Sequence, residues 1–86
     1  MDTVKEVEVM GVKVKVDVDA LDDVDVLDLL GELNDGNVFG LNKLLKILFK
    51  DDYQRIRETL SVDGRFKAST ASEFLVGVLE AANQKN

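Results

Sequence analysis

The side chains that could carry chemistry in this chain are carboxylates, hydroxyls, lysines and arginines, because its 86 residues include no cysteine and no histidine. Without cysteine there is no thiolate nucleophile, no thiolate metal ligand and no disulfide. Without histidine the usual general base and the commonest transition-metal ligand are missing. The hydroxyls of Ser61, Ser69 and Ser72 therefore have no imidazole to activate them. No catalytic residue is predicted, and the chain is not expected to be an enzyme.

The aspartate-rich segment that begins at Asp17 raises the question of calcium binding. An EF-hand loop needs oxygen ligands at positions one, three and five, glycine at six and glutamate at twelve. A loop that starts at Asp17 has Leu21 at its fifth position, and a loop with 63–66 at its middle runs from Thr59 to Thr70. Neither loop supplies enough carboxylates. The glycines match no phosphate-binding spacing, so no metal, cofactor or small-molecule substrate is predicted.

Charge is divided unevenly along the chain. The net charge is −6, yet residues 16–42 contain eight acids and no base, whereas residues 43–67 contain seven bases and four acids. The two segments can attract each other within one fold, or they can support head-to-tail self-association or the docking of a basic partner helix on the acidic segment. The chain as a whole lacks the basic footprint that duplex nucleic acid and anionic membranes require, and no apolar run approaches the ~18 residues of a membrane span. Neither nucleic acid nor a membrane is predicted as a partner.

Two aromatic residues interleave with the basic middle segment. Phe49 and Tyr53 stand among its lysines and arginines, a mixture that can bind single-stranded nucleic acid by stacking. The same two residues are simpler to interpret as core aromatics beside a solvated face, and the acidic balance of the chain favours that interpretation.

The first 18 residues predict a β-hairpin. Valines alternate with charged residues on both sides of Met10 and Gly11, and the parity of the alternation switches at that dipeptide. A two-residue turn there places Glu8 opposite Lys13, and it pairs the valines of one face with each other. A two-stranded ribbon is marginal alone, so the valine face must cover helices or another subunit. The outer strand would be an open edge.

The remainder predicts about four short helices. They run from a cap at Asp22 or Asp19 to about Asn34, from Val38 to about Lys50, from Asp51 or Asp52 through Leu60, and from a capping box at Thr70–Glu73 onward. The second is the most apolar, and we expect it to be central. On the first, one face is apolar (Val26, Leu27, Leu29, Leu30 and Leu33) and the other is acidic (Asp25, Asp28 and Glu32).

The predicted fold class is therefore mainly α with an N-terminal β-hairpin (α+β). A single domain over residues 1–86 would contain the hairpin in 1–18, a helical body in 19–82 and a frayed polar tail in 83–86. Phe39 falls within the polar strip of the second predicted helix, which is unusual for phenylalanine. It either packs under the hairpin, which is the simpler expectation, or forms an exposed anchor for a partner.

Three segments resemble a known family. They are 19–36 (DALDDVDVLDLLGELNDG), LLKILF at 44–49 with DYQRI at 52–56, and DGRF at 63–66 with SEFL at 72–75 and the ending EAANQKN at 80–86. In this order they are similar to the tail assembly chaperones of long-tailed (siphovirus-type) bacteriophages, over about residues 17–86. The hairpin is not part of the resemblance.

The resemblance implies a non-catalytic protein that binds the phage tape-measure protein and keeps its hydrophobic helices soluble during tail assembly. Such a protein acts in the host cytoplasm and is absent from the mature virion. A helix-in-groove contact would be the natural mechanism. We expect apolar contacts from Phe39, Phe49 and Val76 together with the hairpin edge, and steering of basic segments by Asp25, Asp28 and Glu32.

Two other functions are compatible with the residues. A homo-oligomeric module could associate through the edge of the N-terminal hairpin. An acidic mimic of nucleic acid ranks last, because it needs acids spread over the surface and these acids cluster in residues 16–42.

Overall fold

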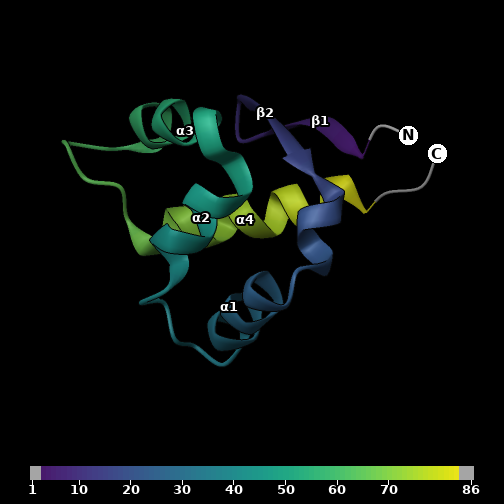
Figure 1. The fold of residues 1–86 in the computed structure, drawn as a ribbon. Coiled ribbons are helices and arrows are strands. Elements are labelled where there is room, and N and C mark those ends of the chain that lie inside the picture. The colour runs from purple at the N-terminus through teal and green to yellow at the C-terminus, as the bar shows by residue number, and fades with distance from the viewer. Residues whose placement is uncertain (1–2, 84–86) are drawn as a thin grey trace.

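The computed structural model describes residues 3–83. An antiparallel hairpin is followed by helices, so the prediction of a mainly α fold with an N-terminal hairpin is confirmed (Figure 1). The elements are β1 (Val4–Val9), β2 (Val12–Asp17), the 3-10 helix η1 (Val18–Asp22), α1 (Val24–Asn34), α2 (Leu41–Phe49), the 3-10 helix η2 (Lys50–Asp52), α3 (Tyr53–Leu60) and α4 (Ala68–Ala82).

The hairpin has the predicted register. Val9 pairs with Val12, and Glu8 pairs with Lys13. The turn residues Met10 and Gly11 have φ values of 54° and 80°, the pair of positive values that a two-residue type I′ turn requires and that matches the twist of the strands. One face of the ribbon is apolar and the other charged. On β2 the apolar face consists of the buried residues Val12, Val14 and Val16.

The apolar face of the ribbon covers two helices. Strand β1 packs on α4 and β2 packs on α2. In Figure 1, α4 crosses beneath the hairpin. The approach of β1 to α4 is close at Gly77, where a Cβ atom would lie 2.6 Å from Cγ1 of Val9. At the end of α4, the Lys5 ammonium donates a 2.8 Å hydrogen bond to the carbonyl of Ala82. This bond gives a partner to a carbonyl at the helix end, and the positive charge interacts favourably with the negative end of the helix dipole.

Helix α2 lies at the centre of the core, as its apolar sequence predicts. Five of its nine residues are buried, namely Leu41, Leu44, Leu45, Leu48 and Phe49. The ring of Phe49 meets that of Phe74 from α4 edge to face, with centroids 5.6 Å apart, a favourable aromatic geometry. The hydrophobic core is thus built from β2, α2, α3 and α4, with Val26 as the buried contribution of α1.

The predicted start of the first helix is wrong. The side chain of Asp23, rather than Asp22 or Asp19, caps α1 by accepting a 2.8 Å hydrogen bond from the Asp25 N–H. A separate 3-10 turn precedes α1, and Asp17 caps it by accepting from the Asp19 N–H. Any aspartate in this run has the chemistry of an N-cap, so residue type alone does not select one.

Two other predicted helix starts are also wrong. Helix α2 begins at Leu41 and not at Val38, after a loop in which the Asn37 side chain accepts a 3.1 Å hydrogen bond from the Phe39 N–H. Helix α4 begins at Ala68, so Thr70 lies inside its first turn and no capping box forms there. Of the predicted tail, Asn83 ends α4, and residues 84–86 lie outside the described part of the chain.

Two glycines inside helices give a matched test of this packing. Gly77→Ala should lower the free energy of unfolding by about 1–2 kcal/mol, because the new methyl group overlaps a stiff β-branched side chain on β1. Gly31→Ala should raise it by about 0.5–1 kcal/mol, because nothing lies within 4 Å and alanine is the better helix former. Urea denaturation of both variants checks the pair. If both variants changed the free energy of unfolding by the same amount in the same direction, the close contact between β1 and α4 would be contradicted.

Candidate functional site

Helix α1 is the least buried of the α-helices. Only Val26 is buried among its eleven residues, while Leu29, Leu30 and Leu33 are half-buried against the core. Val24 and Leu27 are exposed to solvent, although Leu27 was predicted to share the inward face. Helix α1 contacts α2 and η1 and lies away from the hairpin (Figure 1). The side chains on its outer side are therefore exposed to solvent.

The loop after α1 holds Phe39 in solvent. The loop is tied back to the helix by a 2.9 Å hydrogen bond from the Asn37 N–H to the Glu32 carbonyl, and Gly40 packs against the Leu29 side chain. Between these two anchors Phe39 is 94% exposed. The expectation that Phe39 packs under the hairpin is therefore wrong. Burying a phenylalanine side chain contributes about 1.5–3 kcal/mol, so this ring is a strong candidate anchor for a partner.

In the part of the chain that the structure describes, no ion pair joins a base to a carboxylate of α1. Asp25, Asp28 and Glu32 are exposed. Within residues 3–83 the one ion pair joins Arg55 to Asp52, at 3.0 Å and outside α1. A groove of about 290 Å³ between α1 and α2 is lined by Asp25, Asp28, Leu29, Lys43 and Ile47. We call the exposed apolar and acidic side chains of α1 and its following loop the α1 surface, which consists of Val24, Asp25, Leu27, Asp28, Glu32, Asp35, Val38 and Phe39.

Phe49 does not lie on a surface. It is 3% exposed and packs against Phe74, so its predicted role as an exposed contact for a partner is wrong. Tyr53 is also buried, and its hydroxyl donates to Asn42 and accepts a 2.9 Å hydrogen bond from Arg57. Neither ring is available to stack on a nucleobase.

Val76 is exposed, but it belongs to a different surface. It lies on α4 next to Gly77, whose backbone packs against Val9 of the hairpin. A groove of about 400 Å³ runs along this flank and is lined by Ser72, Glu73, Val76, Gly77 and Glu80. The residues predicted from the sequence as partner contacts are therefore not all brought together: the acids lie on α1 and Phe39 lies in the loop after it, whereas Val76 lines a groove on α4.

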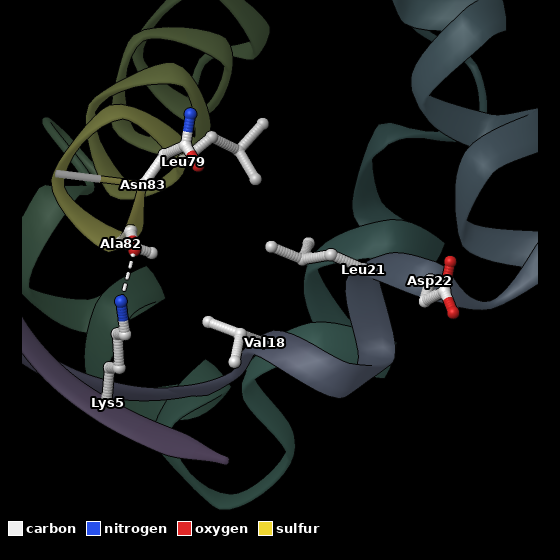
Figure 2. Close-up of a pocket in the computed structure, with 7 residues that line it drawn as sticks. All are labelled: Lys5, Val18, Leu21, Asp22, Leu79, Ala82 and Asn83. Carbon is white, nitrogen blue, oxygen red and sulfur yellow. Dashed lines mark hydrogen bonds between the residues drawn. The ribbon is translucent and has the colours of Figure 1, made fainter. Parts of the chain in front are cut away.

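A further groove of about 500 Å³, lined by both apolar and polar residues, opens between η1 and the end of α4. Figure 2 shows the side chains of Val18, Leu21 and Leu79 pointing into this space, whereas the Asp22 carboxylate points away. The nearby Lys5 ammonium is engaged by the Ala82 carbonyl. Of the two charged residues that line the groove, Lys5 and Asp22, neither forms an ion pair with the other among residues 3–83.

The outer edge of β2 is partly covered by a carboxylate. The side chain of Asp52 accepts a 3.0 Å hydrogen bond from the Lys15 N–H, and it also pairs with Arg55. The Lys15 hydrogen bond is the main reason that the pKa of Asp52 lies below its usual value of 3.8. At the end of β2, a 2.7 Å hydrogen bond from the Thr3 hydroxyl lowers the pKa of Asp17 in the same way.

Sequence reasoning missed several of these residues. The contacts of Asp52 with Lys15 and of Lys5 with Ala82 join positions far apart in the chain, and nothing in the local pattern marks them. Gly77 does carry a signal, because an isolated glycine inside a helical pattern commonly has a packing reason.

No protein-family model, curated protein or solved structure matches this chain. Within residues 3–83, no helix is both long and apolar enough to cross a membrane, and no group of three or more Asp or Glu side chains is placed to hold a metal ion.

The two phenylalanines at 39 and 49 give a direct test of these placements. Phe49→Ala should lower the free energy of unfolding by about 3–5 kcal/mol, because it leaves a cavity in the core. Phe39→Ala should change it by less than about 0.5 kcal/mol, because the ring is already in water. Urea denaturation followed by circular dichroism measures both. A large loss of stability for Phe39→Ala would contradict the exposed position.

The Asp52 carboxylate should contribute stability that depends on pH. Its pKa is lower in the folded state, so its contribution is present above pH 3.8 and is lost as the pH falls through the lowered value. Asp52→Ala should cost roughly 0.5–1 kcal/mol at pH 7, a modest effect because solvent screens the carboxylate. Asp51→Ala, at an exposed neighbour, is the control. Thermal unfolding of wild type and Asp52→Ala is measured from neutral to acidic pH. If the difference in their free energies of unfolding stays constant as the pH falls, the assignment is refuted.

Proposed function

We propose that this chain is a non-catalytic tail assembly chaperone of a long-tailed bacteriophage, which binds the tape-measure protein through the α1 surface and keeps it soluble. The exposed Phe39 side chain in the loop after α1, together with the acids of α1 that form no ion pair within residues 3–83, is the observation that carries this proposal. The resemblance of residues 17–86 to that family supplies the identity of the partner. The protein would act in the host cytoplasm and would be absent from the mature virion.

The α1 surface is suited to an amphipathic partner helix with basic residues. A tape-measure helix would place apolar side chains on Val38 and Phe39, the exposed hydrophobic residues of the loop after α1. Its lysines or arginines would face the acids of α1. Burial of an aromatic anchor supplies most of the binding free energy at such sites, whereas the acids raise the association rate at low salt. Helix-in-groove binding of this kind protects an apolar helix face from aggregation.

Co-expression with the tape-measure protein of the same phage tests the proposal. The tape-measure protein should be soluble and should co-purify with the wild-type chain. Phe39→Ala should weaken the complex about tenfold or more, because an aromatic hot spot contributes ~1–2 kcal/mol or more. Asp25→Asn with Asp28→Asn should weaken binding mainly at low salt.

Val62→Ala is the matched control, because Val62 is also an exposed apolar residue but lies in the turn between α3 and α4. It should leave binding unchanged. A tape-measure protein that remains insoluble beside the wild-type chain, with nothing co-purified, would rule out the proposed partner. A complex that survives Phe39→Ala unchanged would rule out the α1 surface.

A further inference from the structure

We propose that the outer edge of β1, together with the exposed flank of α4, binds an extended basic segment of another protein as a third strand of the sheet. This is a second surface, separate from the α1 surface, and neither depends on the other. Strand addition of this kind uses main-chain hydrogen bonds for affinity and alternate side chains for specificity.

The register of the hairpin shows which main-chain groups of β1 face outward. The Val18 N–H donates a 3.0 Å hydrogen bond to the Thr3 carbonyl. Hydrogen-bonded and non-hydrogen-bonded pairs alternate along an antiparallel ladder, so in the observed register the residues at odd positions of β1 bond to β2. The N–H and C=O groups of Glu6 and Glu8 therefore point away from β2. The equivalent outward N–H on β2 belongs to Lys15, and Asp52 accepts its hydrogen bond. Among residues 3–83, no side chain accepts a hydrogen bond from the N–H of Glu6 or Glu8.

The flank of α4 extends the surface below this edge. Helix α4 lies under β1 and α2 lies under β2, so the side of α4 turned away from α2 is also the side beyond the outer edge of β1. Gly77 approaches Val9 of β1 and also lines the groove formed with Ser72, Glu73, Val76 and Glu80, so the groove borders the contact between α4 and β1. A third strand would place its inward side chains over this groove and would cover Val76, which is 49% exposed.

Charge selects the occupant. Side chains on a strand alternate between faces, so an added strand would meet Glu6 and Glu8 on its outer face and Glu73 and Glu80 on its inner face. All four carboxylates are exposed. The hairpin shows the complementary chemistry, because Glu6 is opposite Lys15 and Glu8 is opposite Lys13. An extended segment with lysine or arginine at alternate positions would repeat these pairs on the other side of β1.

A second copy of this chain fits the edge poorly. In antiparallel pairing of two β1 strands, the registers with most overlap place Glu6 opposite Glu6, Glu6 opposite Glu8 or Lys5 opposite Lys5, and like charges directly opposite are destabilising. Pairing of β1 with the β2 edge of another copy requires the Lys15 N–H to leave Asp52. These features disfavour self-association through the hairpin and leave a foreign basic strand as the occupant.

A nine-residue peptide that alternates lysine with valine or threonine is the probe. Titration at low salt, followed by amide resonances of the uniformly labelled full chain, should shift Glu6, Glu8, Val76 and Gly77 and slow hydrogen exchange at the two glutamate amides. A peptide with glutamate in place of lysine should not bind. N-methylation of the peptide amides that face β1 should abolish binding, whereas N-methylation of the amides on the opposite side should not.

Two charge variants locate the site. Glu73→Gln with Glu80→Gln should weaken binding about threefold to tenfold, because two exposed ion pairs are lost. Glu58→Gln with Asp63→Asn removes the same charge from α3 and the turn after it, outside both proposed surfaces, and should change affinity by less than about twofold. Circular dichroism confirms that both variants fold.

Three results would overturn the proposal: no binding at millimolar peptide, binding that is insensitive to N-methylation, or shifts centred on α1. A concentration-dependent dimer of the chain alone, with the same amides shifted, would also overturn it by showing a second copy as the occupant. The probe contains no phage protein, so these outcomes leave the tape-measure proposal to its own test.

Discussion

Burial of the valine face of the two-stranded ribbon is the constraint on which the rest of the structure depends. Two strands alone cannot hold a face of valines out of water, so β2 must lie on α2 and β1 on α4. The close approach at Gly77 brings β1 onto α4, and Lys5 fastens the start of the ribbon to the end of that helix. With both helices engaged by the ribbon and by each other, α1 has little remaining core to cover and contributes Val26 as its buried residue.

The same arrangement determines where the molecule remains open. Two strands cover two helices, and a third strand would be needed to cover the outer flank of α4. At the edge of β2, the Asp52 carboxylate accepts the hydrogen bond of the Lys15 N–H. At the edge of β1, the main-chain groups of Glu6 and Glu8 point outward. At α1, the loop anchored by Asn37 and Gly40 turns the Phe39 ring outward. Both openings follow from how the core is assembled, and both are surrounded by acids.

The parts of this fold that could be predicted from the sequence are those in which a local pattern has one solution. The switch in valine parity across Met10 and Gly11 permits one hairpin register, and the structure has it. Apolar residues cover more than half of the circumference of the helix at 41–49, so this helix must be surrounded by other elements at the centre of the core. The aspartates at 17, 19, 22 and 23 are chemically equivalent as caps, and the choice of Asp23 depends on how η1 leaves the hairpin. Phe39 and Phe49 differ in burial for a similar reason, because their environments are built by segments distant in the chain.

The carboxylates on the two proposed surfaces favour the same kind of partner, a basic one, although one surface suits a helix and the other an extended strand. The α1 surface suits a helix and the β1 edge suits an extended strand, yet each presents carboxylates without a nearby ion pair among residues 3–83. With a net charge of −6, two copies that approach through these surfaces repel each other, whereas a basic chain is attracted to both. A small domain with an exposed phenylalanine and outward-facing main-chain groups at Glu6 and Glu8 would otherwise be prone to aggregation. Under both proposals, the same acids would act against self-association and would favour a basic partner.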